Sequence, residues 1–170
     1  NTGDMYSLGS TGNTERALGG LQSGQLVPTY GARIDNNTGS TITIVTVSYT
    51  GETWRVGNAN RSDRIDFQYS SSATSLTTGT WVDENNLDYS NPGQATGNGS
   101  VQHSANISFT IKNLNIAPGS SLWIRWNDFD AAGVDDAMGV DDDEDEGTSA
   151  TADMCCNICC LLEDDDDVAN

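Results

Sequence analysis

The chain has 170 residues, which is enough for one domain with its own core but short for two. Its net charge of −18 argues against binding to nucleic acid or anionic lipid, and no apolar run approaches the ~20 residues of a membrane-spanning helix. Charged residues are 19% of the total, and Ser, Thr, Asn and Gly are abundant, which favours a secreted, extracellular β protein.

The acidic residues are concentrated at the C-terminal end of the chain. Residues 1–127 contain nine acids and all seven Lys and Arg, whereas residues 128–170 contain sixteen acids and no Lys or Arg. The sequence therefore predicts a nearly neutral domain followed by a polyanion. We expect the polyanion to attract cations or basic partners.

Alternation of apolar and polar residues predicts strands along most of the chain. One weak helical pattern, over residues 14–21, is interrupted by Gly19 and Gly20. The period of two changes phase between Ile44 and Val45, which predicts a bulge or burial on both faces there. The expected strands are residues 25–34, 41–50, 52–56, 63–71, 81–82, 106–112, 122–126 and 137–141.

Turn sequences separate these strands, and together they predict an all-β fold. We expect an antiparallel two-sheet β-sandwich of jelly-roll type over residues 1–142, in which residues 1–21 are a candidate for exchange with another copy. Residues 143–170 form an extended acidic, Cys-rich tail, which composition alone predicts to be disordered in isolation.

Two clusters have the composition of metal sites. Hard cations such as Ca²⁺ take six to eight oxygen ligands, and the alternative interpretation of the aspartates is a solvated acidic loop. The candidate Ca²⁺ ligands are Asp128, Asp130, Asp135, Asp136, Asp141 and Asp142.

Thiols and a thioether suit Cu or Zn, with disulfides within or between chains as the alternative. The candidates for that second cluster are Met154, Cys155, Cys156, Cys159 and Cys160.

Aromatic residues suggest one further binding surface. Trp54, Trp81 and Trp123 are candidates for a sugar-stacking platform, although aromatic residues on strands more often belong to the core. Trp126 is in phase with Leu122 and Ile124, so we expect it to be buried. The chain has one His and no nucleophile motif or P-loop, so we predict that it is not an enzyme.

Seven segments follow one another in a fixed order between residues 4 and 142: TERALG (14–19), NNTGSTI (36–42), SYTGETWR (48–55), DFQYS (66–70), LTTGTW (76–81), LWIRWNDFD (122–130) and GVDDAMGVDD (133–142). Together they resemble a family of bacterial extracellular β-sandwich modules. The resemblance implies a jelly-roll-like fold and a non-catalytic role at the cell surface. Such modules normally continue into an apolar closing strand, whereas this chain continues with the acids of residues 143–146.

These features predict a structural subunit of an extracellular bacterial assembly, such as a filament or surface layer. The sandwich lacks an apolar closing strand, so a segment of the next copy, within residues 5–21 or 152–162, is expected to add at the open edge. Bound metal ions, Ca²⁺ first, would neutralise the tail. The alternative is a calcium-stabilised carbohydrate-binding or adhesion module whose partner is a polysaccharide.

Overall fold

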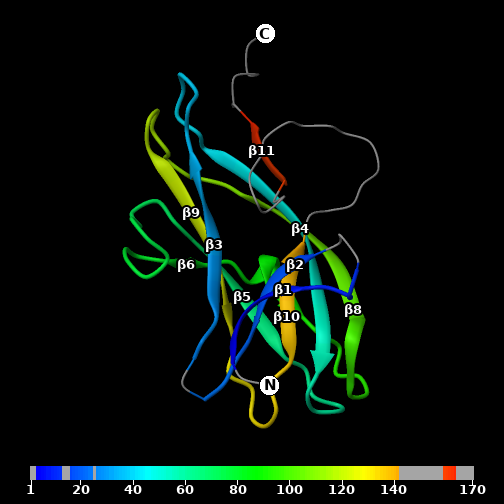
Figure 1. The fold of residues 1–170 in the computed structure, drawn as a ribbon. Helices are drawn as coiled ribbons and strands as arrows, with labels where there is room; N and C mark the ends of the chain where they lie inside the picture. The colour runs from blue at the N-terminus through cyan, green and yellow to red at the C-terminus, as the bar shows by residue number, and fades with distance from the viewer. Residues whose placement is uncertain (1–2, 13–15, 25, 142–158, 164–170) are drawn as a thin grey trace.

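The computed structural model describes residues 3–12, 16–24 and 26–141, together with the backbone of residues 159–163. In these ranges the chain forms antiparallel strands and one short 3₁₀ turn, which confirms the predicted β-sandwich (Figure 1). The elements are β1 (Asp4–Leu8), β2 (Ala17–Leu21), β3 (Thr29–Asp35), β4 (Ile44–Val56), β5 (Arg64–Ser70), β6 (Val82–Asp83), η1 (Asn85–Leu87), β7 (Tyr89–Ser90), β8 (Gly97–Ile111), β9 (Ser121–Asp128), β10 (Ala137–Asp141) and β11 (Cys159–Glu163).

The strands form two sheets. In the first sheet the order is β1-β2-β10-β4, with β8 on the other edge of β4 and β11 beside the end of β10. In the second sheet the order is β3-β9-β5, with the short strands β6 and β7 on the outer edge of β5. Among the described residues, no helix is long and apolar enough to cross a membrane.

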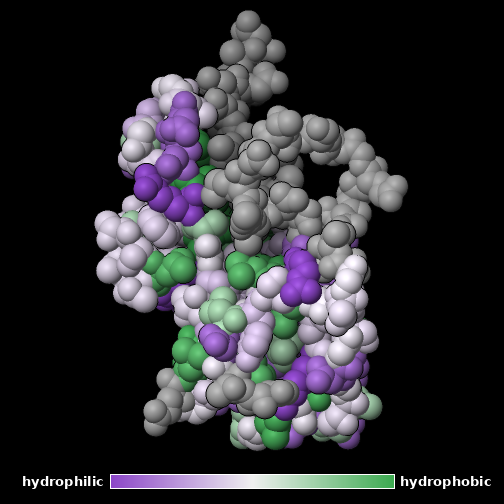
Figure 2. Space-filling model, viewed as in Figure 1, coloured by the Kyte–Doolittle hydropathy of each residue, from purple (hydrophilic) through white to green (hydrophobic). Residues whose placement is uncertain are grey.

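The core between the sheets is centred on Trp126, whose side chain is fully buried as predicted. Its ring stacks on Tyr30, with centroids 6.0 Å apart. Tyr49 and Phe67 meet it edge-on at 5.1 and 5.4 Å, so side chains from both sheets converge on one indole. Such aromatic contacts add to the stabilisation from apolar burial. The described surface in Figure 2 is mostly hydrophilic or neutral, with separate small apolar patches.

Residues 17–21, where the sequence showed only a weak, interrupted helical pattern and predicted no strand, form β2. Gly19 lies so close to β10 that a Cβ atom on it would meet the carbonyl oxygen of Met138. The pairing of β4 with β8 is regular from Val45 to Thr53 and shifts register between Thr53 and Arg55. The register also changes beside the predicted irregularity at residues 44–45, because Val45 pairs with Ile111 whereas Ile42 pairs with Ile116. The predicted strands 41–50 and 52–56 therefore form one long strand, and β1 and the first half of β8 had no clear sequence pattern.

Candidate functional site

Strand β4 is the central strand of the first sheet, and one of its edges is completed by the distant segment β11. Along one edge, β8 pairs with β4 from Val45 to Val56. On the other edge, β10 pairs only with residues 50–55, because β10 ends at Asp141. Residues 44–48 on that edge pair instead with β11, in antiparallel register (Figure 1).

The edge that β11 covers belongs to the apolar core. The register places Cys160 opposite Val47 and Leu162 opposite Val45, and both valines are buried. Thr46 lies between them and bonds to Thr110 of β8 through the two hydroxyls, 2.9 Å apart. Without a strand beside them, these residues would present unpaired backbone groups next to the core. The segment 159–163 thus replaces the apolar closing strand that is missing after residue 142.

The predicted exchangeable segments have different positions. Residues 159–163, which overlap the predicted donor 152–162 in all but residue 163, pair with this edge of β4 as a strand of the same chain. The N-terminal candidate instead forms β1 and β2, which pair with each other and with β10. The remainder of the tail, including Met154, Cys155 and Cys156, lies outside the described residues.

A second site lies at the end of the sandwich where β9 ends and β10 begins. Arg61 is its positive centre: its Nη2 lies 2.7 Å from Asp63 Oδ2 and 3.4 Å from Asp136 Oδ1. Its Nη1 donates to the carbonyl oxygens of Ala131 and Ala132 at 3.1 and 2.9 Å. The guanidinium therefore ties the loop before β10 to the start of β5.

The buried carboxylates around Arg61 are largely satisfied by hydrogen bonds. Asp63 accepts bonds from the backbone N–H groups of Arg64 and Asp136, at 3.0 and 3.2 Å. Asp136 accepts from the backbone N–H of Gly57 at 2.7 Å and from the side-chain amide of Asn91. Burial raises the pKa of Asp136, and the charge of Arg61 opposes that rise.

Asp128 differs from its neighbours because its buried carboxylate has only the backbone amide of Gln22 beside it. Asp128 is 4% exposed. Among the described residues, neither of its carboxylate oxygens accepts a hydrogen bond of normal geometry. Burial first, then the charges of Asp63 and Asp135, raises the pKa of Asp128 to about 8, while the nearby backbone amide of Gln22 opposes the rise. A carboxyl group in this state is either protonated or needs a cation.

The structure divides the six predicted Ca²⁺ ligands. Asp128, Asp135 and Asp136 lie in one cluster, which also contains Asp63, a residue that the sequence interpretation missed. Asp130 is exposed beside this cluster, Asp141 lies at the far end of β10, and Asp142 is outside the described residues. Within the described ranges, no three His, Cys, Asp or Glu side chains already converge as a metal-ligand set.

Arg61 was also absent from the sequence interpretation. One local signal was available, because Arg61 and Asp63 flank a single residue directly before a clear strand pattern. Their connection to Asp136 depends on the packing of β5 near β10, which no local pattern shows.

The three candidate sugar-binding tryptophans do not form one platform. Trp54 is 6% exposed and donates from Nε1 to Glu52 at 2.6 Å, so its ring is not available to a sugar. Trp81 and Trp123 are partly exposed. The guanidinium of Arg125 lies 4.0 Å from the centroid of the Trp81 ring, and Trp123 is two residues away on the same strand, β9.

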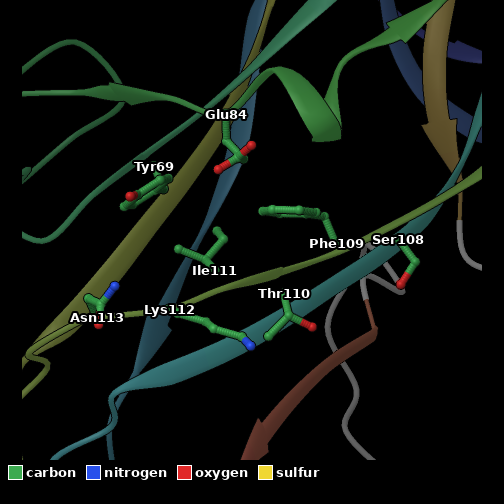
Figure 3. Close-up of a pocket in the computed structure, with 8 residues that line it drawn as sticks. All are labelled: Tyr69, Glu84, Ser108, Phe109, Thr110, Ile111, Lys112 and Asn113. Carbon is green, nitrogen blue, oxygen red and sulfur yellow. The ribbon is translucent and has the colours of Figure 1, made fainter.

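A cavity of about 600 Å³ opens where β8 faces β5 (Figure 3). The side chains of Tyr69, Glu84, Phe109 and Ile111 surround it, whereas Ser108 and Thr110 point away from it. Tyr69 and Phe109 also pack against the core, so the cavity is the open side of the sandwich, between the edge strands of the two sheets.

His103, the single histidine, belongs to a structural contact. Its Nδ1 lies 3.0 Å from the hydroxyl oxygen of Tyr89, and the two rings stack with centroids 5.9 Å apart. The Tyr89 hydroxyl also lies 2.9 Å from Thr53 Oγ1, and burial raises the pKa of Tyr89 to about 12. The phenol therefore stays protonated near neutral pH.

Comparison with known proteins gives no relative: no family model, curated protein or solved structure matches the chain. The resemblance to bacterial surface modules therefore stays a prediction.

Proposed function

We propose that the chain is a non-catalytic structural subunit of an extracellular bacterial filament or surface layer, joined to other copies by strand complementation. The observation that carries this proposal is the pairing of β11 with residues 44–48 of β4. The pairing consists of backbone hydrogen bonds between two short segments, so the same segment of another copy can make the same bonds.

The length of the intervening segment supports exchange. Seventeen residues, 142–158, separate the end of β10 from the start of β11. Replacement of a chain's own strand by the same strand of a neighbour is domain swapping. It exchanges one set of contacts for an equivalent set, so the free energies of the closed monomer and the exchanged form differ little. A chain that accepts one strand and donates another in a head-to-tail arrangement does not close on itself, so it grows into a fibre.

Bound cations complete this proposal. Sixteen acids after residue 127 repel one another when copies assemble, and divalent cations, Ca²⁺ first, would reduce that repulsion. The cysteines of residues 155–160 would strengthen the joint through Cu, Zn or disulfides. The extracellular location is supported by the hydroxyl-rich, weakly charged composition of residues 1–127.

The substitution Leu162→Asp tests the role of β11. The substitution places a charge opposite buried Val45 and so disfavours the pairing of β11 with β4, whether β11 comes from the same chain or from another copy. Assembly should therefore be lost. The control is Val27→Asp, which places the same charge at a residue that is 53% exposed. Light scattering and electron microscopy measure assembly, and circular dichroism verifies the fold. Normal fibres from folded Leu162→Asp protein would show that the proposal is wrong.

A second candidate function is a calcium-stabilised carbohydrate-binding or adhesion module. Its support is that Trp81, which the Arg125 guanidinium covers, and Trp123, two residues from Arg125 on β9, are both partly exposed. Retention on immobilised polysaccharide should then fall at least tenfold in Trp123→Ala, since stacking on an aromatic ring contributes much of such binding. Equal retention of the variant would remove this candidate.

A further inference from the structure

The most unusual feature of the molecule outside the β4 edge is the set of buried oxygens around Asp128. Four oxygen atoms there have no hydrogen-bond partner among the described residues: Oδ1 and Oδ2 of Asp128, Oδ1 of Asp135 and Oε1 of Gln22. Gln22 is 5% exposed, and its backbone amide lies beside the Asp128 carboxylate. When Asp128 is ionised, these atoms are all acceptors and cannot satisfy one another.

The charges at this end of the sandwich are also unbalanced. Asp63, Asp128, Asp135 and Asp136 interact through their charges, and Arg61 is the cation in contact with three of them. Arg55 also acts on Asp135 and Asp136 through its charge. Asp128, which is 4% exposed, is absent from the ion pairs of Arg61. Two arginines therefore face four carboxylates, and a cation of charge +2 near Asp128 would balance the charge and bond to the unused acceptors.

We infer that this end of the domain binds one divalent cation, with Asp128 as the principal ligand and Asp135 and Gln22 beside it. An oxygen-only set that mixes carboxylates with an amide suits Ca²⁺, which accepts irregular coordination by six to eight oxygens, whereas Mg²⁺ demands near-octahedral geometry. Water molecules would complete the shell.

Binding requires small rotations, because the carboxylates do not converge on one point in the structure. The hydrogen bonds of Asp63 and Asp136 to Arg61 and to backbone N–H groups hold those two side chains in place. The Asp128 carboxylate has only the backbone amide of Gln22 beside it, and Oδ1 of Asp135 has only a long ion pair, 4.0 Å from Nη1 of Arg61. These two side chains therefore have the fewest interactions to break when they rotate.

The site lies within one chain, so it differs from cation binding by the tail. This inference rests on the proposed function in one respect, since it names where one of the proposed Ca²⁺ ions binds. Ca²⁺ binding is measured on the monomeric full chain. Assembly is followed separately by light scattering in the same samples. A failure of the calcium site and a failure of strand exchange then give different results.

The test compares Asp128→Asn with Asp83→Asn in the full chain. Both variants remove one negative charge, but Asp83 is exposed on β6. Asn has nearly the shape of Asp and removes a buried charge, so the fold should persist. Calorimetric titration of chelator-stripped protein with CaCl₂ should show one site of higher affinity above the weak binding of the tail. That site should weaken at least tenfold in Asp128→Asn and stay unchanged in Asp83→Asn.

Thermal unfolding gives an independent measurement. A ligand at about 100 times its Kd stabilises a protein of this size enough to raise Tm by roughly 5–10 °C. This calcium-dependent rise should be present in the wild type and in Asp83→Asn and absent in Asp128→Asn. If both variants respond to Ca²⁺ like the wild type, or if the wild type shows only weak multiple binding, the inference is wrong.

Discussion

Arg61 and Asp136 join two segments that are distant in the sequence, since Nη2 of the arginine lies 3.4 Å from Oδ1 of the aspartate. The same nitrogen lies 2.7 Å from Oδ2 of Asp63. One guanidinium thereby fixes the loop that leads into β10 against the start of β5. The position of β10 in turn determines how much of the β4 edge is left for β11.

We therefore predict that Arg61→Gln destabilises the domain strongly. The substitution leaves two buried carboxylates, Asp63 and Asp136, without their cation, and loss of one partner of a buried ion pair costs about 3–5 kcal/mol. The measurement is the free energy of unfolding from urea denaturation. The control, Arg33→Gln, removes an exposed pair with Asp35 and should cost at most about 1 kcal/mol. Equal losses for the two variants would contradict this role of Arg61.

The stability of the calcium-free protein should depend on the ionisation of Asp128. Its pKa is about 8 in the folded protein and has its ordinary lower value in the unfolded chain, so the folded state binds the proton more tightly. The stabilisation is complete below the unfolded pKa and is lost as the pH rises through about 8. The free energy of unfolding should fall by at most about 1.4 kcal/mol per pH unit over that range.

Comparison with Asp128→Asn isolates this contribution, because the other acids titrate in both proteins. In the presence of a chelator, the variant should become the more stable of the two as the pH rises from 5 to 8. Above pH 9 the difference should become constant. A difference in stability that does not change with pH would show that Asp128 keeps an ordinary pKa.

The contact between Gly19 and Gly139 should be sensitive to a single methyl group. Gly19→Ala places a Cβ atom against the carbonyl oxygen of Met138, so β2 must move away from β10. Overpacking of this kind typically costs about 1–3 kcal/mol. Gly24→Ala is the matched control, since nothing lies within 4 Å of its added Cβ. Thermal unfolding of both variants measures the effect, and unchanged stability of Gly19→Ala would contradict the close approach.

Much of the fold was predictable because several strands follow a simple pattern. In β5 and β9 one face is buried and the other is polar, so period-two alternation is plain in residues 64–70 and 121–128. The pattern of β2 was misleading because its two glycines indicate a broken helix locally, whereas in the structure they permit close packing between strands. A pattern of single residues contains no information about such contacts.

The candidate site was predictable only in part for a similar reason. Asp128, Asp135 and Asp136 are near one another in the sequence and in the fold, but β10 carries Asp141 roughly 15 Å away, at ~3.3 Å per residue. Asp63 and Arg61 enter the cluster through the packing of β5 beside β9. The acids after residue 142 predicted a sandwich without an apolar closing strand of its own, because a run of carboxylates cannot be buried, but they did not indicate that β4 is the strand concerned.

Pairing of segment 159–163 of one copy with β4 of another should place chosen residues of two molecules close enough for a disulfide. Two populations with different cysteines can therefore detect this exchange. One population has all four cysteines replaced by Ser and carries Ser48→Cys, and the other keeps only Cys159. The register sets Cys159 opposite Ser48, and paired residues of antiparallel strands have Cα atoms ~4.5–5.5 Å apart, which suits a disulfide.

After the two populations are assembled together and oxidised, our account predicts a mixed covalent dimer on a non-reducing gel. Ser71→Cys, in an exposed bend outside the strands, replaces Ser48→Cys in the control and should give little of this product. Assembly without the mixed dimer, or an equal yield from the control, would contradict strand exchange.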